Sequence, residues 1–182
     1  KIDASHSDSS VSTSDETIIF SVGNTVAIDG LGVLFVTSEL YASTGGCKLF
    51  QLVGELGQHY LMQLALSKEM RHKIRVESRI LNHATDNNKE GVLPSLVYVH
   101  ARNEFLVTHF SYFHVENPLS NIINKEFVPL NKGWTEMASQ LLKQLSAIHS
   151  SGYVYGTIDL ENIHYSPDKG GRFYLSNIGS VY

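Results

Sequence analysis

The 182-residue chain is poor in several features that would announce a function directly. It has one cysteine, Cys47, which excludes an internal disulfide framework. It has no run of about 18 apolar residues, so no membrane-spanning helix is expected. Its formal net charge is −4, which argues against a general nucleic-acid binder. Nine histidines are scattered without ligand spacing, and with a single cysteine they predict no zinc site.

Positive charge is almost absent from the first quarter of the chain. After Lys1 the next lysine or arginine is Lys48, and six carboxylates lie between them. A site in this stretch that had to bind a polyanion would therefore lack a cation.

The first part of the chain divides into a polar tail, a strand-rich segment and one clear helix. Residues 1–16 are rich in Ser, Asp and Thr, with little to bury, and predict a flexible tail. Apolar and β-branched runs separated by glycine-bearing turns predict strands at 18–22, 33–37 and 48–53. A 3-4 spacing of apolar residues then predicts a helix over 67–83.

The second part continues with short strands and a second helix. Strands are expected at 95–100 and 104–110, a short helix near 119–124, and a strong helix at 134–150. Strand-like sequence returns at 152–155, 163–165 and 172–175. Antiparallel strands followed by helix-rich sequence predict an α+β fold rather than a doubly wound parallel sheet.

The helix at 67–83 carries two distinct faces. Its inner face is formed by Met70, Ile74, Glu77 and Leu81. Another face is a basic stripe, which could bind an acidic protein partner or could simply be solvated, and it consists of Lys68, Arg71, Arg75 and Arg79.

Several segments, taken in order, resemble the motifs of protein kinases. Residues 149–162 resemble the catalytic loop, and Asn177-Ile-Gly179 stands where D-F-G is expected. Residues 76–81, 47–53 and 27–32 resemble the helix with the ion-pairing Glu, the V-A-I-K strand and the Gly-rich loop. The resemblance implies a kinase-like small lobe over 17–110, with an antiparallel sheet and one main helix. It also implies the beginning of a helical large lobe over 111–182, whose remainder would be missing or in another chain.

The resemblance fails at the positions that carry the chemistry. Phosphoryl transfer needs a cation on the phosphates, metal ligands and a group that accepts the hydroxyl proton. Thr157 replaces the catalytic Asp, Asp159 the loop lysine, Asn177 the metal-binding Asp, and Gln51 the strand lysine. The resemblance therefore implies a pseudokinase with no productive ATP or metal binding. It would act as a scaffold or allosteric regulator of a protein partner.

At other positions of the implied nucleotide pocket, the residue either matches the kinase pattern or differs from it. In the Gly-rich loop only Gly32 is clearly kept, while Leu34 and Leu49 would flank the adenine and His164 would lie beneath it. Asn162 and Glu77 match the family pattern. The hydrophobic stack that links the two lobes of a kinase is matched by Leu81, Tyr155 and Ile178.

Glu77 lies on the apolar face of its helix without the usual lysine, and a buried carboxylate without a partner is costly. It could accept hydrogen bonds from Gln51 or backbone amides, which we favour, it could be protonated, or the helix could swing outward. A peripheral glutamate without a special role is the remaining interpretation.

Three readings of the function stay open. The divergent loops are similar to those of the secreted rhoptry-type pseudokinases of coccidian parasites, which would imply export into a parasite-derived compartment. Alternatively, the chain is an atypical nucleotide-dependent transferase in which Asp159 or Asn162 has a new role. A third reading is an unrelated α+β module, in which the helix at 67–83 would not pack against the strand with Gln51.

Overall fold

The computed structural model describes residues 20–40, 46–86, 92–109, 118–120, 133–156, 158–166 and 171–181. Six antiparallel strands form one curled sheet in the order β1-β2-β3-β4-β6-β5. Their bounds are β1 Thr25–Ile28, β2 Gly32–Leu40, β3 Cys47–Gly54, β4 His59–Ala65, β5 Leu96–Val99 and β6 Phe105–His109. The predicted α+β class is confirmed.

Two of these strands, β1 and β4, were not predicted from the sequence. The segment of β4 reads HYLMQLA, with large apolar side chains on both faces, so it lacks the alternation that marks a half-buried strand. A strand was predicted instead at residues 18–22, and this prediction is wrong for its described part, because Phe20–Val22 lie outside any strand. The other predicted strands of the sheet are present with small changes at their ends.

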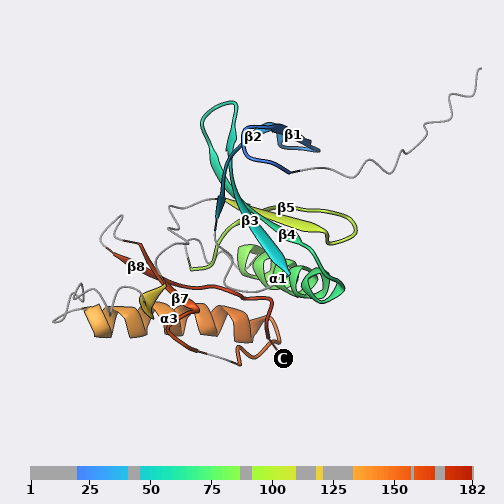
Figure 1. Ribbon diagram of the computed structural model, residues 1–182. Helices are drawn as coiled ribbons and strands as arrows, with labels where there is room; N and C mark the ends of the chain where they lie inside the picture. The colour runs from blue at the N-terminus through green and yellow to red at the C-terminus, as the bar shows by residue number, and fades with distance from the viewer. Residues whose placement is uncertain are drawn as a thin grey trace, which may run out of the picture.

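Helix α1 spans Lys68–Asp86 and begins at a serine cap. The Ser67 hydroxyl accepts a hydrogen bond from the backbone N–H of Met70 at 3.2 Å, which satisfies one of the free donors of the first turn. Met70, Ile74 and Leu81 are buried, as their spacing predicted. The helix lies under the sheet and packs on β4, β5 and β6 (Figure 1).

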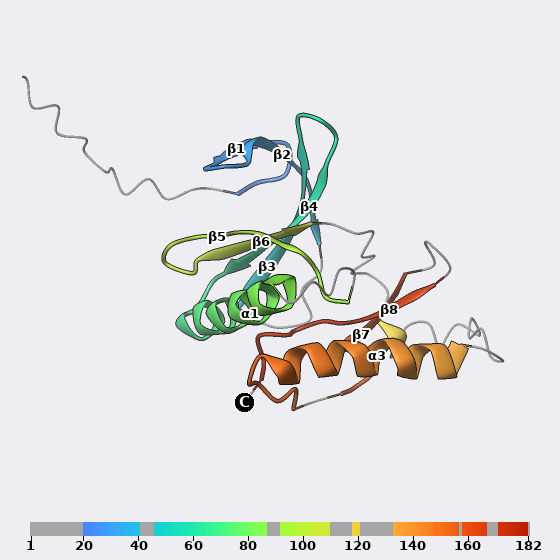
Figure 2. The same cartoon turned by 180° about the vertical axis from the view of Figure 1, so that it is seen from behind.

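Helix α3, Gly133–Ser150, and a small hairpin form a second layer beneath α1 (Figure 2). The hairpin consists of β7 Ile163–Ser166 and β8 Arg172–Leu175. The buried Gln144 amide joins it to α3, donating to the Phe173 carbonyl at 2.7 Å and accepting from the Leu175 N–H at 2.9 Å. The helix thus supplies β8 with polar partners in the interior.

The buried side chains form two clusters on opposite faces of the sheet. One fills the inside of the curl and includes Leu34, Phe50 and Met62. The other joins the opposite face to α1, α3 and the hairpin, and includes Ile74 and Ile148. The second cluster therefore holds the sheet, α1 and the lower layer together.

Some predictions fall partly or wholly outside the described residues. The predicted tail at 1–16 lies outside them, and of the predicted helix at 119–124 only Leu119 and Ser120 are described, in helical conformation. The strand predicted at 152–155 is wrong, because Tyr155 makes only an isolated bridge with Val181. In the described chain, neither helix combines the length and apolar character needed to cross a membrane.

Candidate functional site: a cavity between the sheet and the lower layer

A cavity of about 80 Å³ lies where the sheet, α1 and the lower layer meet. Half of its lining is aliphatic or proline, and half is polar. The apolar residues are Leu49, Leu61, Pro94, Leu106, Leu175 and Ile178, and the polar residues are Gln63, Glu77, Thr108, His164, Ser176 and Asn177. Three of the predicted pocket positions, Leu49, Glu77 and His164, are thus brought together.

Glu77 is the only acidic residue in this lining, and no lysine or arginine belongs to it. Its carboxyl accepts hydrogen bonds from the backbone N–H of Gly179 and from the side-chain amide of Gln63. Burial raises the pKa of Glu77 to about 7, although these two hydrogen bonds oppose the rise. Its charged form is thus stabilised by amide dipoles alone, without an ion pair in the described residues.

The partner of Glu77 corrects one sequence-based expectation. Backbone amides were expected beside Glu77, and Gly179 supplies one. The side chain is Gln63 of β4, however, and not Gln51 of β3. The Gln51 amide lies within 3.3 Å of the Ser38 hydroxyl and 3.4 Å of His59 Nδ1.

The register of the sheet explains this difference. Gln63 is paired with Leu49, and Gln51 is paired with Leu61. Paired residues share a face of the sheet, so Gln51 lies on the same face as Gln63 but one step farther along it. Helix α1 packs on β4 and on β6 and β5 beyond it, so β3 lies one strand farther from the helix than β4 does.

Gly179 approaches α1 so closely that only glycine fits. A Cβ built at this position would overlap the backbone carbonyl of Lys73. This contact brings the Gly179 N–H to the Glu77 carboxyl, one helical turn farther along α1. The glycine expected from the D-F-G-like triplet is therefore required by packing at its observed position.

Two predicted pocket positions, Gly32 and Leu34, do not line the cavity. Gly32 is the first residue of β2, directly after the tight turn from β1, with a φ of 78°, and Leu34 is fully buried inside the curl. Leu34 belongs to the cluster on the face of the sheet away from α1, so it cannot contact a molecule beside Glu77.

His164 is buried and lies within 3.0 Å of the Ser176 hydroxyl through Nε2. The Ser176 hydroxyl also lies 3.3 Å from the Asn162 carbonyl, to which it can donate. The other ring nitrogen of His164, Nδ1, is buried without a hydrogen-bond partner among the described residues. Burial lowers the pKa of His164, which keeps the ring neutral at pH 7.

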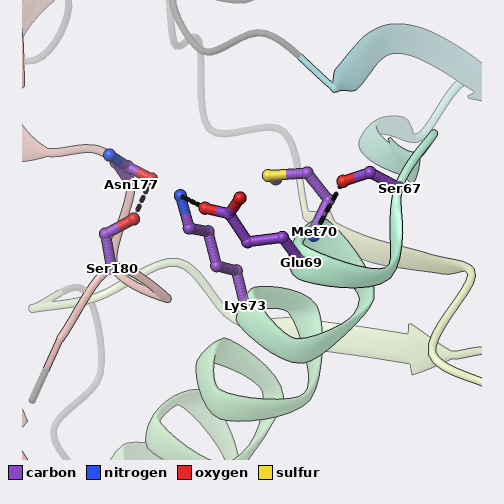
Figure 3. A network of polar contacts seen from close by, with 6 residues as sticks. All are labelled: Ser67, Glu69, Met70, Lys73, Asn177 and Ser180. Carbon is purple, nitrogen blue, oxygen red and sulfur yellow. Dashed lines mark hydrogen bonds and ion pairs between the residues drawn. The ribbon is translucent and has the colours of Figure 1, made fainter.

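Asn177 stands at the corner of the cavity with a φ of 57°. Its side-chain oxygen accepts a hydrogen bond from the Ser180 hydroxyl at 2.8 Å. Figure 3 shows Lys73 of α1 beside this pair, with its ammonium turned to Glu69, 3.0 Å away. The nearest lysine on α1 is thus paired on the helix surface.

The positions that were expected to form a catalytic loop are less closely connected to the cavity. Asp159 is exposed, and its carboxylate accepts the N–H groups of Glu161 and Asn162 at 3.0 and 2.9 Å, as in a turn. Asn162 is not part of the lining, and Thr157 lies outside the described residues. The carboxylate proposed as a substitute base therefore has a local structural role.

Leu81, Tyr155 and Ile178, expected to form a stack between the two layers, all belong to the large cluster that joins them. The Tyr155 hydroxyl donates to the Ser176 carbonyl at 2.8 Å. Burial, with smaller contributions from the charges of Asp159 and Glu77, raises the pKa of Tyr155 to about 12. The phenol therefore stays protonated and available as a donor.

The basic stripe of α1 is on the outer face of the helix. Lys68, Arg75 and Arg79 are exposed, and Arg71 lies 3.7 Å from the Glu104 carboxylate. One 19-residue helix carries five of the 14 lysines and arginines of the chain when Lys73 is included. This face is a concentrated positive surface on a protein of negative net charge.

No group of three or more His, Cys, Asp or Glu residues is placed to hold a metal ion in the described part of the chain. No protein-family model matches the chain, and no curated protein is significantly similar to it. The resemblance to protein kinases, and to the rhoptry-type pseudokinases in particular, therefore stays a prediction.

Proposed function

We propose that this chain is a degenerate kinase-like domain that binds a protein partner and does not transfer phosphate. The contact between Glu77 and Gln63 is the observation that carries the proposal. In protein kinases a strand lysine pairs with a helix glutamate, and this pair must form for activity. Here the helix glutamate is kept, and the side chain that meets it is a neutral amide.

This contact also moves the proposed match between the strands of this chain and the kinase motifs by one strand. The lysine position becomes Gln63 on β4, and the Gly-rich loop position moves from 27–32 to the connection between β2 and β3. That connection contains Gly45 and Gly46, and its residues 41–45 lie outside the described part of the chain. The shift accounts for the position of Leu34 and Gly32 away from the cavity.

The remaining chemistry of the cavity favours binding over phosphoryl transfer. Two phosphate groups and a divalent metal ion would need cations and carboxylates around them. The lining offers one carboxylate, Glu77, and no lysine or arginine, while Asn177 presents a neutral amide already bonded to Ser180. A triphosphate would be repelled by ionised Glu77 without any compensating charge.

The surface proposed for the protein partner is the basic face of α1. Four cationic side chains repeat every three or four residues along the helix, over about 16 Å from Lys68 to Arg79. Three of them are exposed, without a carboxylate partner among the ion pairs of the described residues. Such a stripe is complementary to an acidic helix or an acidic extended segment.

The proposal is tested by incubating the purified chain with ATP and either Mg²⁺ or Mn²⁺. We expect no change in melting temperature with nucleotide, and no labelled product from radiolabelled ATP with the chain itself or a generic protein as acceptor. Labelled product would instead identify an atypical transferase. A melting shift without product would remove the claim that ATP and metal do not bind productively, and would leave a nucleotide-binding pseudokinase.

A further inference from the structure

The cavity beside Glu77 is rich in hydrogen-bond acceptors. Glu77 contributes a carboxyl group that accepts only two hydrogen bonds, from Gly179 and Gln63, although a carboxylate has about four acceptor positions. The side-chain oxygen of Gln63 is buried without a partner, and so is Nδ1 of His164. Glu77 and Gln63, which line the same cavity, therefore have acceptor capacity that the described residues do not use.

The lining supplies no cation to this carboxylate. None of the twelve lining residues is a lysine or an arginine. The Gln63 amide, which donates to Glu77, is neutral. Lys73, the lysine one turn away on α1, is paired with Glu69 at 3.0 Å (Figure 3). A buried carboxylate in this position is stabilised most by a cation that brings its own N–H donors.

The rest of the lining defines the kind of molecule that would carry such a cation. Leu49, Leu61 and Leu106 form an apolar wall next to the polar end of the cavity. The volume of about 80 Å³ corresponds to about five water molecules, which limits the ligand to a small organic group. An apolar group attached to an ammonium would satisfy both halves of the lining.

We propose that this cavity binds a small primary ammonium with a short apolar group, its N–H donors directed at Glu77 and its apolar part against the three leucines. This inference does not depend on the kinase-like proposal, because it uses only the residues that line the cavity. It differs from a nucleotide site in the sign of the charge that it selects.

Three small probes of similar shape and different charge test the proposal. Isobutylamine is a cation at pH 8, isobutanol is neutral, and isobutyrate is an anion. At this pH Glu77, with a pKa of about 7, is ionised. We expect calorimetric titration of the full chain to show at least tenfold tighter binding of isobutylamine than of isobutanol, and no binding of isobutyrate.

Substitutions locate the binding. Glu77→Gln should abolish the preference for isobutylamine, whereas Asp86→Asn, a change of the same kind at an exposed carboxylate of the same helix, should leave it intact. Gln63→Lys should also abolish isobutylamine binding, because the protein then supplies its own ammonium to Glu77. This second variant keeps the experiment decisive if Glu77→Gln does not fold. Equal affinities for isobutylamine and isobutanol, or equal effects of Glu77→Gln and Asp86→Asn, would overturn the proposal.

Discussion

The backbone N–H of Gly179 donates a hydrogen bond to the carboxyl of Glu77, 102 residues earlier in the chain. This bond joins the segment after β8 to α1, and the carbonyl of Lys73 packs against the same glycine. A partly buried carboxyl group is thereby held between two layers by amide groups alone. Its protonation should therefore be measurable in the stability of the whole fold.

The first prediction concerns the pH dependence of stability. The pKa of Glu77 is raised from the usual 4.5 to about 7, so between these values the folded state binds more protons than the unfolded state. Its contribution is complete below pH 4.5 and is lost as the pH rises through 7, by about 3 kcal/mol. Urea denaturation of the wild type and Glu77→Gln at pH 4.5 and pH 8 should show this loss in the difference between them. A difference that stays constant with pH would contradict the burial of the carboxyl.

The second prediction distinguishes Gln63 from Gln51. Gln63→Lys should form an ion pair with Glu77, lower the pKa of this carboxyl and stabilise the protein at pH 8 by about 1 to 2 kcal/mol. Gln51→Lys is the matched control, since Gln51 contacts Ser38 and His59 instead. We expect thermal unfolding to show a higher midpoint for Gln63→Lys alone. The opposite ranking would mean that β3, not β4, supplies the partner of Glu77.

The third prediction concerns the close contact at Gly179. Gly179→Ala should separate the C-terminal segment from α1 and cost about 2 to 3 kcal/mol, because the new Cβ meets the rigid backbone of Lys73. Gly54→Ala is the control, since its Cβ would meet the flexible side chain of Gln58 and should cost less than about 1 kcal/mol. Chemical denaturation measures both values. Similar costs for the two variants would rule out a specific role for the contact with α1.

The fourth prediction concerns the basic face of α1. Arg75→Glu should weaken binding of a glutamate-rich peptide at least tenfold at low ionic strength, and the loss should shrink as salt is added. Because Arg75 is exposed, the folding stability should change by no more than about 0.5 kcal/mol. Lys143→Glu, at an exposed position of α3, is the control in fluorescence anisotropy titrations. Equal losses in the two variants would indicate a nonspecific charge effect.

The sequence by itself determined the parts of this protein that depend on local periodicity. The 3-4 spacing along α1 predicted both its buried face, with Met70 and Ile74, and its exposed basic face, with Arg75 and Arg79. The position of helix α3 and the two short strands of the lower hairpin were also predicted from local patterns, although Trp134 and Leu142 of the apolar stripe of α3 are exposed. These features follow from the 3.6-residue period of a helix or the two-residue period of a strand, and both periods can be recognised in a short stretch of sequence.

Only the tertiary structure decided which side chain meets Glu77. Nothing in the residues of β4 marks it as a strand between β3 and the helix, because it is apolar on both faces. The choice of Gln63 over Gln51 depends on the order and register of strands that are joined by backbone hydrogen bonds, and Gly179 reaches the same carboxyl from the other end of the domain. These contacts depend on how distant segments of the chain pack together, so local sequence patterns do not predict them.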